Sequence, residues 1–114
     1  MVVDPINAQI EQYMTLLSAR QEVVASNIAN ADTPGYKTKD IDFQSELQAA
    51  MSGLGPGVTE VRGLRVKNDG NNVSLDREAR LLSENAMRFN MASNLIKDQL
   101  KELKLAIEGG GATA

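Results

Sequence analysis

The residues of this sequence that could perform chemistry are acidic and amide side chains in two short segments. Residues 40–44 read Asp-Ile-Asp-Phe-Gln, an alternation of oxygen ligands that is typical of the start of a calcium-binding loop. Such a loop also needs glycine at its sixth position and glutamate at its twelfth, where this chain has Ser45 and Met51. Residues 69–71, Asp-Gly-Asn, also resemble the start of such a loop, but Val73 stands where the next oxygen ligand is needed. We interpret both segments as turn and capping residues and predict no metal site.

Composition excludes most other catalytic chemistry. The chain has 114 residues and contains neither cysteine nor histidine, which excludes disulfides, thiolate nucleophiles and histidine acid–base catalysis. The glycine-rich run 53–57 lacks the Gly-Lys-Ser/Thr ending of a phosphate-binding loop. The sequence therefore predicts a protein that is not an enzyme and that binds no cofactor.

Charge and hydrophobicity exclude two further classes of partner. The formal net charge is −3 and the 12 basic residues are scattered, so no nucleic-acid surface is predicted. No segment approaches the ~20 apolar residues of a membrane-spanning helix. Residues 1–5 combine neither a basic start nor an apolar run, so we expect no cleaved signal peptide.

The first element that must position these side chains is an amphipathic helix predicted over residues 5–29. Asp4 is placed to cap it, and Pro5 falls at the first helical position, where its missing N–H costs nothing. We expect the helix to end near Asn30, which tolerates a left-handed conformation, because Pro34 prevents its continuation. The apolar residues recur mainly with a 4-3 spacing. They are Ile10, Met14, Leu17, Val24 and Ile28.

The second long element is a helix predicted over residues 74–108, with Ser74 as its cap. Gly109-Gly110-Gly111 is expected to stop it and to leave a loose tail. A sustained seven-residue repeat predicts a coiled-coil seam, so this helix needs a helical partner along its length. The large apolar residues of the predicted seam are Leu75, Leu82, Phe89, Ile96, Leu100, Leu103 and Ile107.

The segment between the two helices is less regular. A short helix is predicted over residues 42–51, with Phe43 and Leu47 on one side. The run 53–57 then interrupts regular structure, and residues 58–66 alternate in a way that predicts a short strand.

These elements predict a mainly α fold, in which the N- and C-terminal helices form an antiparallel, coiled-coil-like pair. The expected divisions are residues 1–36 (helix and turn), 37–73 (glycine-rich, partly disordered middle), 74–108 (heptad helix) and 109–114 (disordered tail). A single hairpin of two helices leaves the outer half of each apolar stripe in water. Burying a large apolar side chain is worth about 1.5–3 kcal/mol. The sequence therefore favours an assembled state.

The turn after the first helix is the most informative segment. Asn27 and Asn30 can bond backbone groups at the helix end. Pro34 and Gly35 suit the two central positions of a type II turn, since proline fixes φ and glycine supplies φ > 0. The amphipathic ring of Tyr36 then projects from an extended segment that follows the turn. Local physics alone explains this segment as a well-made helix end and turn.

Residues 27–37, Asn-Ile-Ala-Asn-Ala-Asp-Thr-Pro-Gly-Tyr-Lys, also resemble the N-terminal signature of flagellar rod and hook axial proteins. Residues 40–43 (Asp-Ile-Asp-Phe) and 69–73 (Asp-Gly-Asn-Asn-Val) resemble the proximal rod proteins of the flagellar basal body. The resemblance covers both ends and most of the chain. It is weakest over residues 52–67, which look short and glycine-rich for that family.

The resemblance implies a structural subunit of the proximal rod, self-associating through its terminal helices into the tubular shaft that transmits torque. It implies a place in the basal body, in the periplasm, after export through the flagellar type III apparatus. The implied partners are other rod proteins and the rod-base junction protein at the membrane ring. The implied assembly residues are those of the signature. They are Asn27, Ile28, Asn30, Thr33, Pro34, Gly35 and Tyr36.

Two alternatives stay open at the level of sequence. Phe43 and Leu47 are similar to an export-gate recognition element of rod and hook subunits, yet they also form one apolar face of a short helix. The whole chain could instead be a cytosolic helical adaptor or export chaperone that binds a partner helix through the heptad seam.

Overall fold

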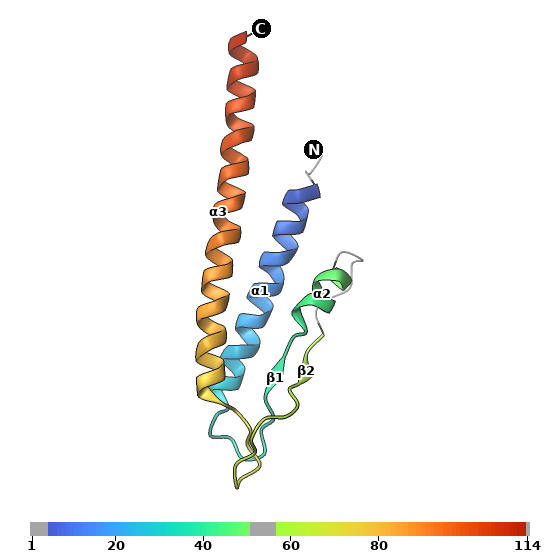
Figure 1. Cartoon of the computed structure of the whole chain (residues 1–114), viewed down its shortest axis with the longest axis vertical. Helices are drawn as coiled ribbons and strands as arrows, with labels where there is room; N and C mark the ends of the chain where they lie inside the picture. Colours follow the sequence, from blue (N-terminus) through green and yellow to red (C-terminus); the bar gives the residue numbers. More distant parts are fainter. Residues whose placement is uncertain (1–4, 51–56, 114) are drawn as a thin grey trace.

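A computed structural model describes residues 5–50 and 57–113 of the chain. The molecule is long and thin, measuring 72 × 26 × 18 Å, and its radius of gyration is 19.1 Å. A compact chain of about 100 residues would have a radius of gyration near 13 Å. The length comes from two antiparallel helices, α1 (Pro5–Ala29) and α3 (Leu75–Thr113), which lie side by side (Figure 1). The predicted mainly α fold is confirmed.

The middle of the chain forms a small layer on the side of α1 away from α3 (Figure 1). Strand β1 (Lys39–Asp40) pairs antiparallel with β2 (Thr59–Glu60), with Lys39 opposite Glu60 and Asp40 opposite Thr59. Helix α2 (Phe43–Ala50) follows β1. Asp42 caps α2, because its carboxylate accepts a hydrogen bond from the Ser45 N–H at 3.5 Å, and a second, at 3.0 Å, from the Ser45 hydroxyl.

This middle layer confirms the predicted short helix and short strand, although β2 covers only part of the range 58–66. Three expectations fall outside the described residues. They concern the Asp4 cap, the helix end at Met51 and the glycine-rich run up to Pro56.

Helix α1 packs through four of the five residues of its predicted stripe, and Ile10 and Met14 among them are half-buried. Leu17 and Val24 are buried, and Leu16, which the spacing did not select, is also buried. The stripe is displaced by one residue only at the end of the helix, where Asn27 is buried and Ile28 is 37% exposed. Asn27 takes the inward position because four polar groups surround it, as described below.

Helix α3 does not end at the three glycines. It continues to Thr113, so the predicted stop at Gly109 is wrong. Glycine lowers helix stability by about 1 kcal/mol per residue relative to alanine, but it retains its N–H and can continue the hydrogen-bond ladder. No proline follows to remove a donor. At 1.5 Å per residue, the 39 residues of α3 span about 58 Å, against about 38 Å for the 25 residues of α1. The C-terminal part of α3 therefore extends past the start of α1 (Figure 1).

Candidate assembly site

The turn that follows α1 has the predicted geometry. The Tyr36 N–H donates a 3.2 Å hydrogen bond to the Thr33 carbonyl, and Gly35, at the third position of the turn, has φ = +75°. These features define a type II turn with Pro34 at its second position. Asn30 differs from expectation, because every non-glycine residue that the structure describes has negative φ. Asn30 instead ends the helix with its side chain, which donates a 2.8 Å hydrogen bond to the Ser26 carbonyl.

Asn27 is the best-satisfied polar side chain of the signature and is fully buried. Its amide nitrogen donates to the Lys39 carbonyl at 2.8 Å and to Glu78 Oε1 at 3.1 Å. Its amide oxygen accepts from the Lys39 N–H and from the Tyr36 hydroxyl, both at 3.1 Å. The Asn27 amide thus pairs with both backbone groups of Lys39, as a neighbouring strand would. One side chain links α1, β1 and α3.

A second loop, residues 67–73, closes over the signature turn. The amide nitrogen of Asn71 donates to the carbonyls of Asn30 and Thr33 at 2.9 and 2.8 Å. The Gly35 N–H donates to the Asp69 carbonyl at 2.8 Å. The matched segments 27–37 and 69–73, far apart in the sequence, therefore bind each other within one chain.

The same two segments approach closely enough to require glycine. Gly70 has φ = +85°, and a Cβ atom built on it would lie 3.3 Å from the Cα of Gly35. The Lys37 ammonium donates to the Gly70 carbonyl. Next to this contact, the Thr38 N–H donates to Asn72 Oδ1 at 2.6 Å, and both residues are buried. We call the segments 26–38 and 67–73 together the clasp.

Beside the clasp lies an ionic cluster that the sequence did not reveal. Asp40 accepts hydrogen bonds from Arg20 at 3.0 and 3.1 Å and from Arg77 at 2.6 Å. Arg77 also pairs at 2.9 Å with Glu78, whose side chain is fully buried. Burial disfavours the charged form of Asp40, but the hydrogen bonds from Arg20 and the Ile41 N–H, with the charge of Arg20, outweigh it and lower its pKa. No periodic pattern links these residues, because they come from three separate elements.

Helix α3 turns an unexpected face toward α1. Glu78, Asn85 and Ala92 are buried and Gln99 is half-buried. These residues, which we call the inner seam, are spaced seven apart. Asn85 donates to the Leu17 carbonyl and to Gln21 Oε1, both at 3.3 Å. The polar heptad of α3 therefore packs on α1.

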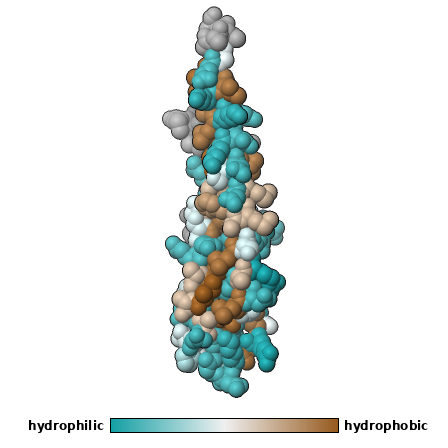
Figure 2. Space-filling view, turned by 90° about the vertical axis from the view of Figure 1, so that its left-hand side faces the viewer, coloured by the Kyte–Doolittle hydropathy of each residue, from teal (hydrophilic) through white to brown (hydrophobic). Residues whose placement is uncertain are grey.

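The predicted apolar seam lies mostly in solvent. Each inner-seam residue follows a residue of the predicted apolar seam by three positions, so the two seams lie about 60° apart around the helix axis. Among the predicted seam residues, Leu82 and Ile96 are half-buried. Figure 2, viewed from the α3 side, shows hydrophobic side chains in a broken band along the molecule. The exposed members are Leu75, Phe89, Leu100, Leu103 and Ile107. We call all seven residues the outer stripe.

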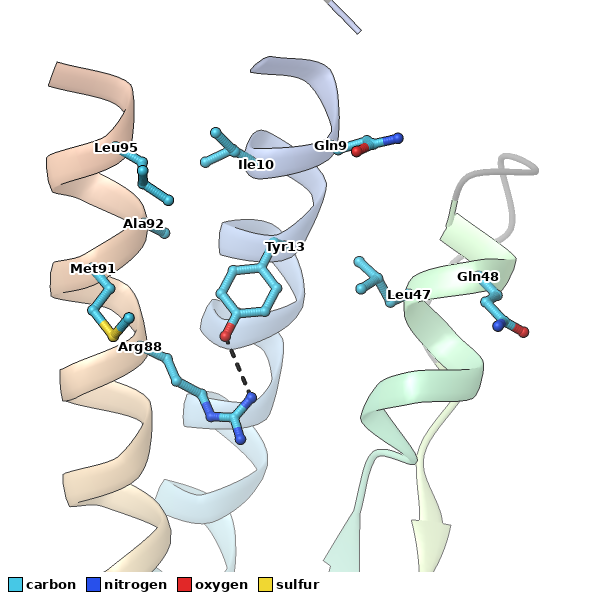
Figure 3. Close-up of a pocket in the computed structure, with 9 residues that line it drawn as sticks. All are labelled: Gln9, Ile10, Tyr13, Leu47, Gln48, Arg88, Met91, Ala92 and Leu95. Atoms are coloured by element: carbon cyan, nitrogen blue, oxygen red, sulfur yellow. Dashed lines mark hydrogen bonds between the residues drawn. The ribbon is translucent and has the colours of Figure 1, made fainter. Parts of the chain in front are cut away.

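Phe43 and Leu47 both contribute to packing in the structure. The Phe43 ring meets Tyr13 edge to face, with ring centres 5.3 Å apart, and the Arg88 guanidinium lies 5.9 Å from its centre. Leu47 points from α2 toward α1 and helps to line a groove of about 600 Å³ between the helices (Figure 3). These contacts account for both residues as the apolar face of a short helix. Their role in export stays a prediction.

Within the described residues, no group of acidic side chains is arranged to hold a metal ion. No helix in that part of the chain is long and apolar enough to cross a membrane. An elongated helical hairpin, held together at one end and bearing a largely exposed apolar stripe beside its helix–helix contact, is the architecture of a structural subunit that packs into a larger assembly.

Comparison with known proteins specifies that assembly. A family model described as flagella basal body rod protein matches residues 14–37. The flagellar basal body rod protein FlgB of Escherichia coli K12 is 30% identical, over 96% of this chain and 99% of that protein. FlgB of Salmonella typhimurium is 33% identical over 88% of this chain and 91% of that protein. FlgB of Borrelia hermsii is 31% identical over 85% of this chain and 91% of that protein. This chain belongs to the FlgB family of flagellar basal body rod proteins.

The chain is therefore a structural subunit of the flagellar basal body rod. This assignment decides against the cytosolic adaptor or export chaperone that the sequence left open. These three relatives carry the name of a flagellar basal body rod protein, and the basal body is the location that the family indicates. The family model covers the second half of α1 and the signature turn, and so includes most of the first of the two segments that build the clasp.

Proposed function

We propose that the two terminal helices form the inner, coiled-coil layer of a tubular rod that crosses the periplasm and transmits torque. In this proposal the subunit reaches the rod through the flagellar type III export apparatus. It contacts copies of itself, other rod proteins and the rod-base junction protein at the membrane ring. Its role is mechanical, and it catalyses no reaction.

The observation that carries this proposal is the exposure of the outer stripe. Leu100 and Leu103 are each 56% exposed and Ile107 is 67% exposed, and all three lie in the C-terminal part of α3. Exposed apolar side chains that repeat along one line of a helix in this way mark an interaction site. The spacing of the stripe suits a helix with its own heptad repeat, because each side chain can enter a hole between four partner side chains.

Torque transmission also requires that each subunit hold its shape along the rod axis. The clasp and the ionic cluster meet this requirement, since they join α1, β1 and α3 through buried, charge-assisted hydrogen bonds. The residues of the signature then support assembly indirectly, by fixing the angle and register of the two helices. The members of the signature that are exposed, and so accessible to a neighbour, are Ile28, Thr33, Pro34 and Gly35.

The outer stripe provides a matched pair of variants for testing the proposal. Leu103 lies on the stripe, and Leu105, 57% exposed, lies about 200° further around the same helix. We expect Leu103→Asp to prevent incorporation into detergent-extracted basal bodies and to abolish swimming, and Leu105→Asp to affect both far less. The free energy of unfolding of the purified chain should change little in either variant, because both side chains are exposed. Equal incorporation of the two variants would contradict the proposal.

A further inference from the structure

The inner seam has a feature that packing alone does not explain. Five buried side-chain oxygens lack a hydrogen-bond partner within the residues that the structure describes, and three of them belong to Glu78, Asn85 and Gln99. These three residues occupy one heptad position of α3, with Ala92 as its fourth member. The other two oxygens belong to Asn7 and Gln12 of α1. The unsatisfied polar groups are therefore concentrated in the two paired helices.

A helix that buried its most apolar face would turn the outer stripe toward α1. That rotation, about 60° about the α3 axis, would separate Glu78 from Asn27 and Asn85 from Gln21. The observed packing keeps these polar contacts and leaves large apolar side chains such as Phe89 exposed. Polar residues at core heptad positions characteristically fix the register and partner of a helix at a cost in stability.

We infer that Glu78 and Asn85 are specificity-determining residues that commit the polar face of α3 to its own α1 and reserve the outer stripe for a helix of a neighbouring rod subunit. Glu78 sets the position at the clasp, where Asn27 and Arg77 hold it. Asn85, two helical turns further along α3, fixes the same face through its hydrogen bonds to Leu17 and Gln21 of α1. The part of this inference that gives the outer stripe to a neighbouring subunit rests on the proposed function. The part that concerns which face of α3 packs on α1, and in which register, does not.

The test uses the purified chain, which has no native cysteine. Spin labels on cysteines at the exposed positions Glu11 and Asn90 report the distance between α1 and α3. We expect one narrow distance distribution for the otherwise native chain. Asn85→Leu makes the inner seam more apolar and removes the polar contact that selects it. We therefore expect a second population of the distance between the two labels, in which α3 is rotated, amounting to about 10% of the molecules or more. We also expect concentration-dependent dimers in this variant.

Asn94→Leu is the matched control, because it makes the same substitution at an exposed position of α3. It should keep the single distribution and stay monomeric. If Asn85→Leu does not fold, Asn85→Ala replaces it, since alanine already occupies the seam at Ala92. A single narrow distribution in the folded Asn85 variant, or several distances in the otherwise native chain, would overturn the inference. Normal incorporation of Leu103→Asp would instead refute the proposed function and leave the register result standing.

Discussion

Replacing Asn27 by alanine tests whether the signature acts by holding the chain together. The change removes four hydrogen bonds of 2.8–3.1 Å from a fully buried side chain. The Tyr36 hydroxyl can turn toward Ser26 or water, so we count three lost bonds at about 1 kcal/mol each. Asn27→Ala should therefore lower the free energy of unfolding by about 3 kcal/mol and the Tm by about 10 °C.

The assay is urea unfolding of the purified chain, followed by circular dichroism at the helix band. Asn30→Ala is the matched control within the same signature. The Asn30 side chain bonds the Ser26 carbonyl and the Thr33 hydroxyl in exposed positions, so its loss should cost about 0.5–1 kcal/mol. Similar destabilisation in the two variants, or a loss below about 1 kcal/mol for Asn27→Ala, would refute the assignment of Asn27 as the central link.

Three further predictions address the glycines, the ionic cluster and the short helix. Gly70→Ala should lower the free energy of unfolding by about 1 kcal/mol more than Gly63→Ala does. Both positions have positive φ, but only a methyl group at position 70 would meet neighbouring backbone, at 3.3 Å from the Cα of Gly35. Equal losses of stability in urea unfolding would contradict this prediction. The lowered pKa of Asp40 means that its ionised form stabilises the fold above the unfolded-state pKa of about 4, and this contribution is lost as pH falls through the folded-state value. Urea midpoints should therefore fall more steeply below about pH 4 in the native chain than in Asp40→Asn, and parallel curves would count against the cluster. Replacing Phe43 and Leu47 together by alanine should lower stability while secretion continues; lost secretion with unchanged stability would support the export interpretation.

The placement of polar and apolar surface suits a subunit that is built in two stages. Polar groups gather at the clasp and the inner seam, where they define one arrangement of the two helices. Apolar groups remain on the outside of α3, where they can be buried only against other molecules. Directional hydrogen bonds select geometry, whereas apolar burial is non-directional and scales with area. The chain thus uses directional contacts within the subunit and leaves apolar area for the assembly.

Local sequence determined the elements of this protein and its family. Pro5 at a helix start, Pro34 with Gly35 at a turn, and two heptad patterns act through dihedral limits and contacts a few residues apart, so they could be read directly. The face of α3 that packs on α1 could not be read this way, because periodicity selects the most apolar stripe. Only the tertiary structure brought Asn27 to Glu78 and Asp40 between Arg20 and Arg77. Those pairs join residues 20 to 51 positions apart, and these polar contacts, rather than the largest apolar area of α3, lie where the elements meet.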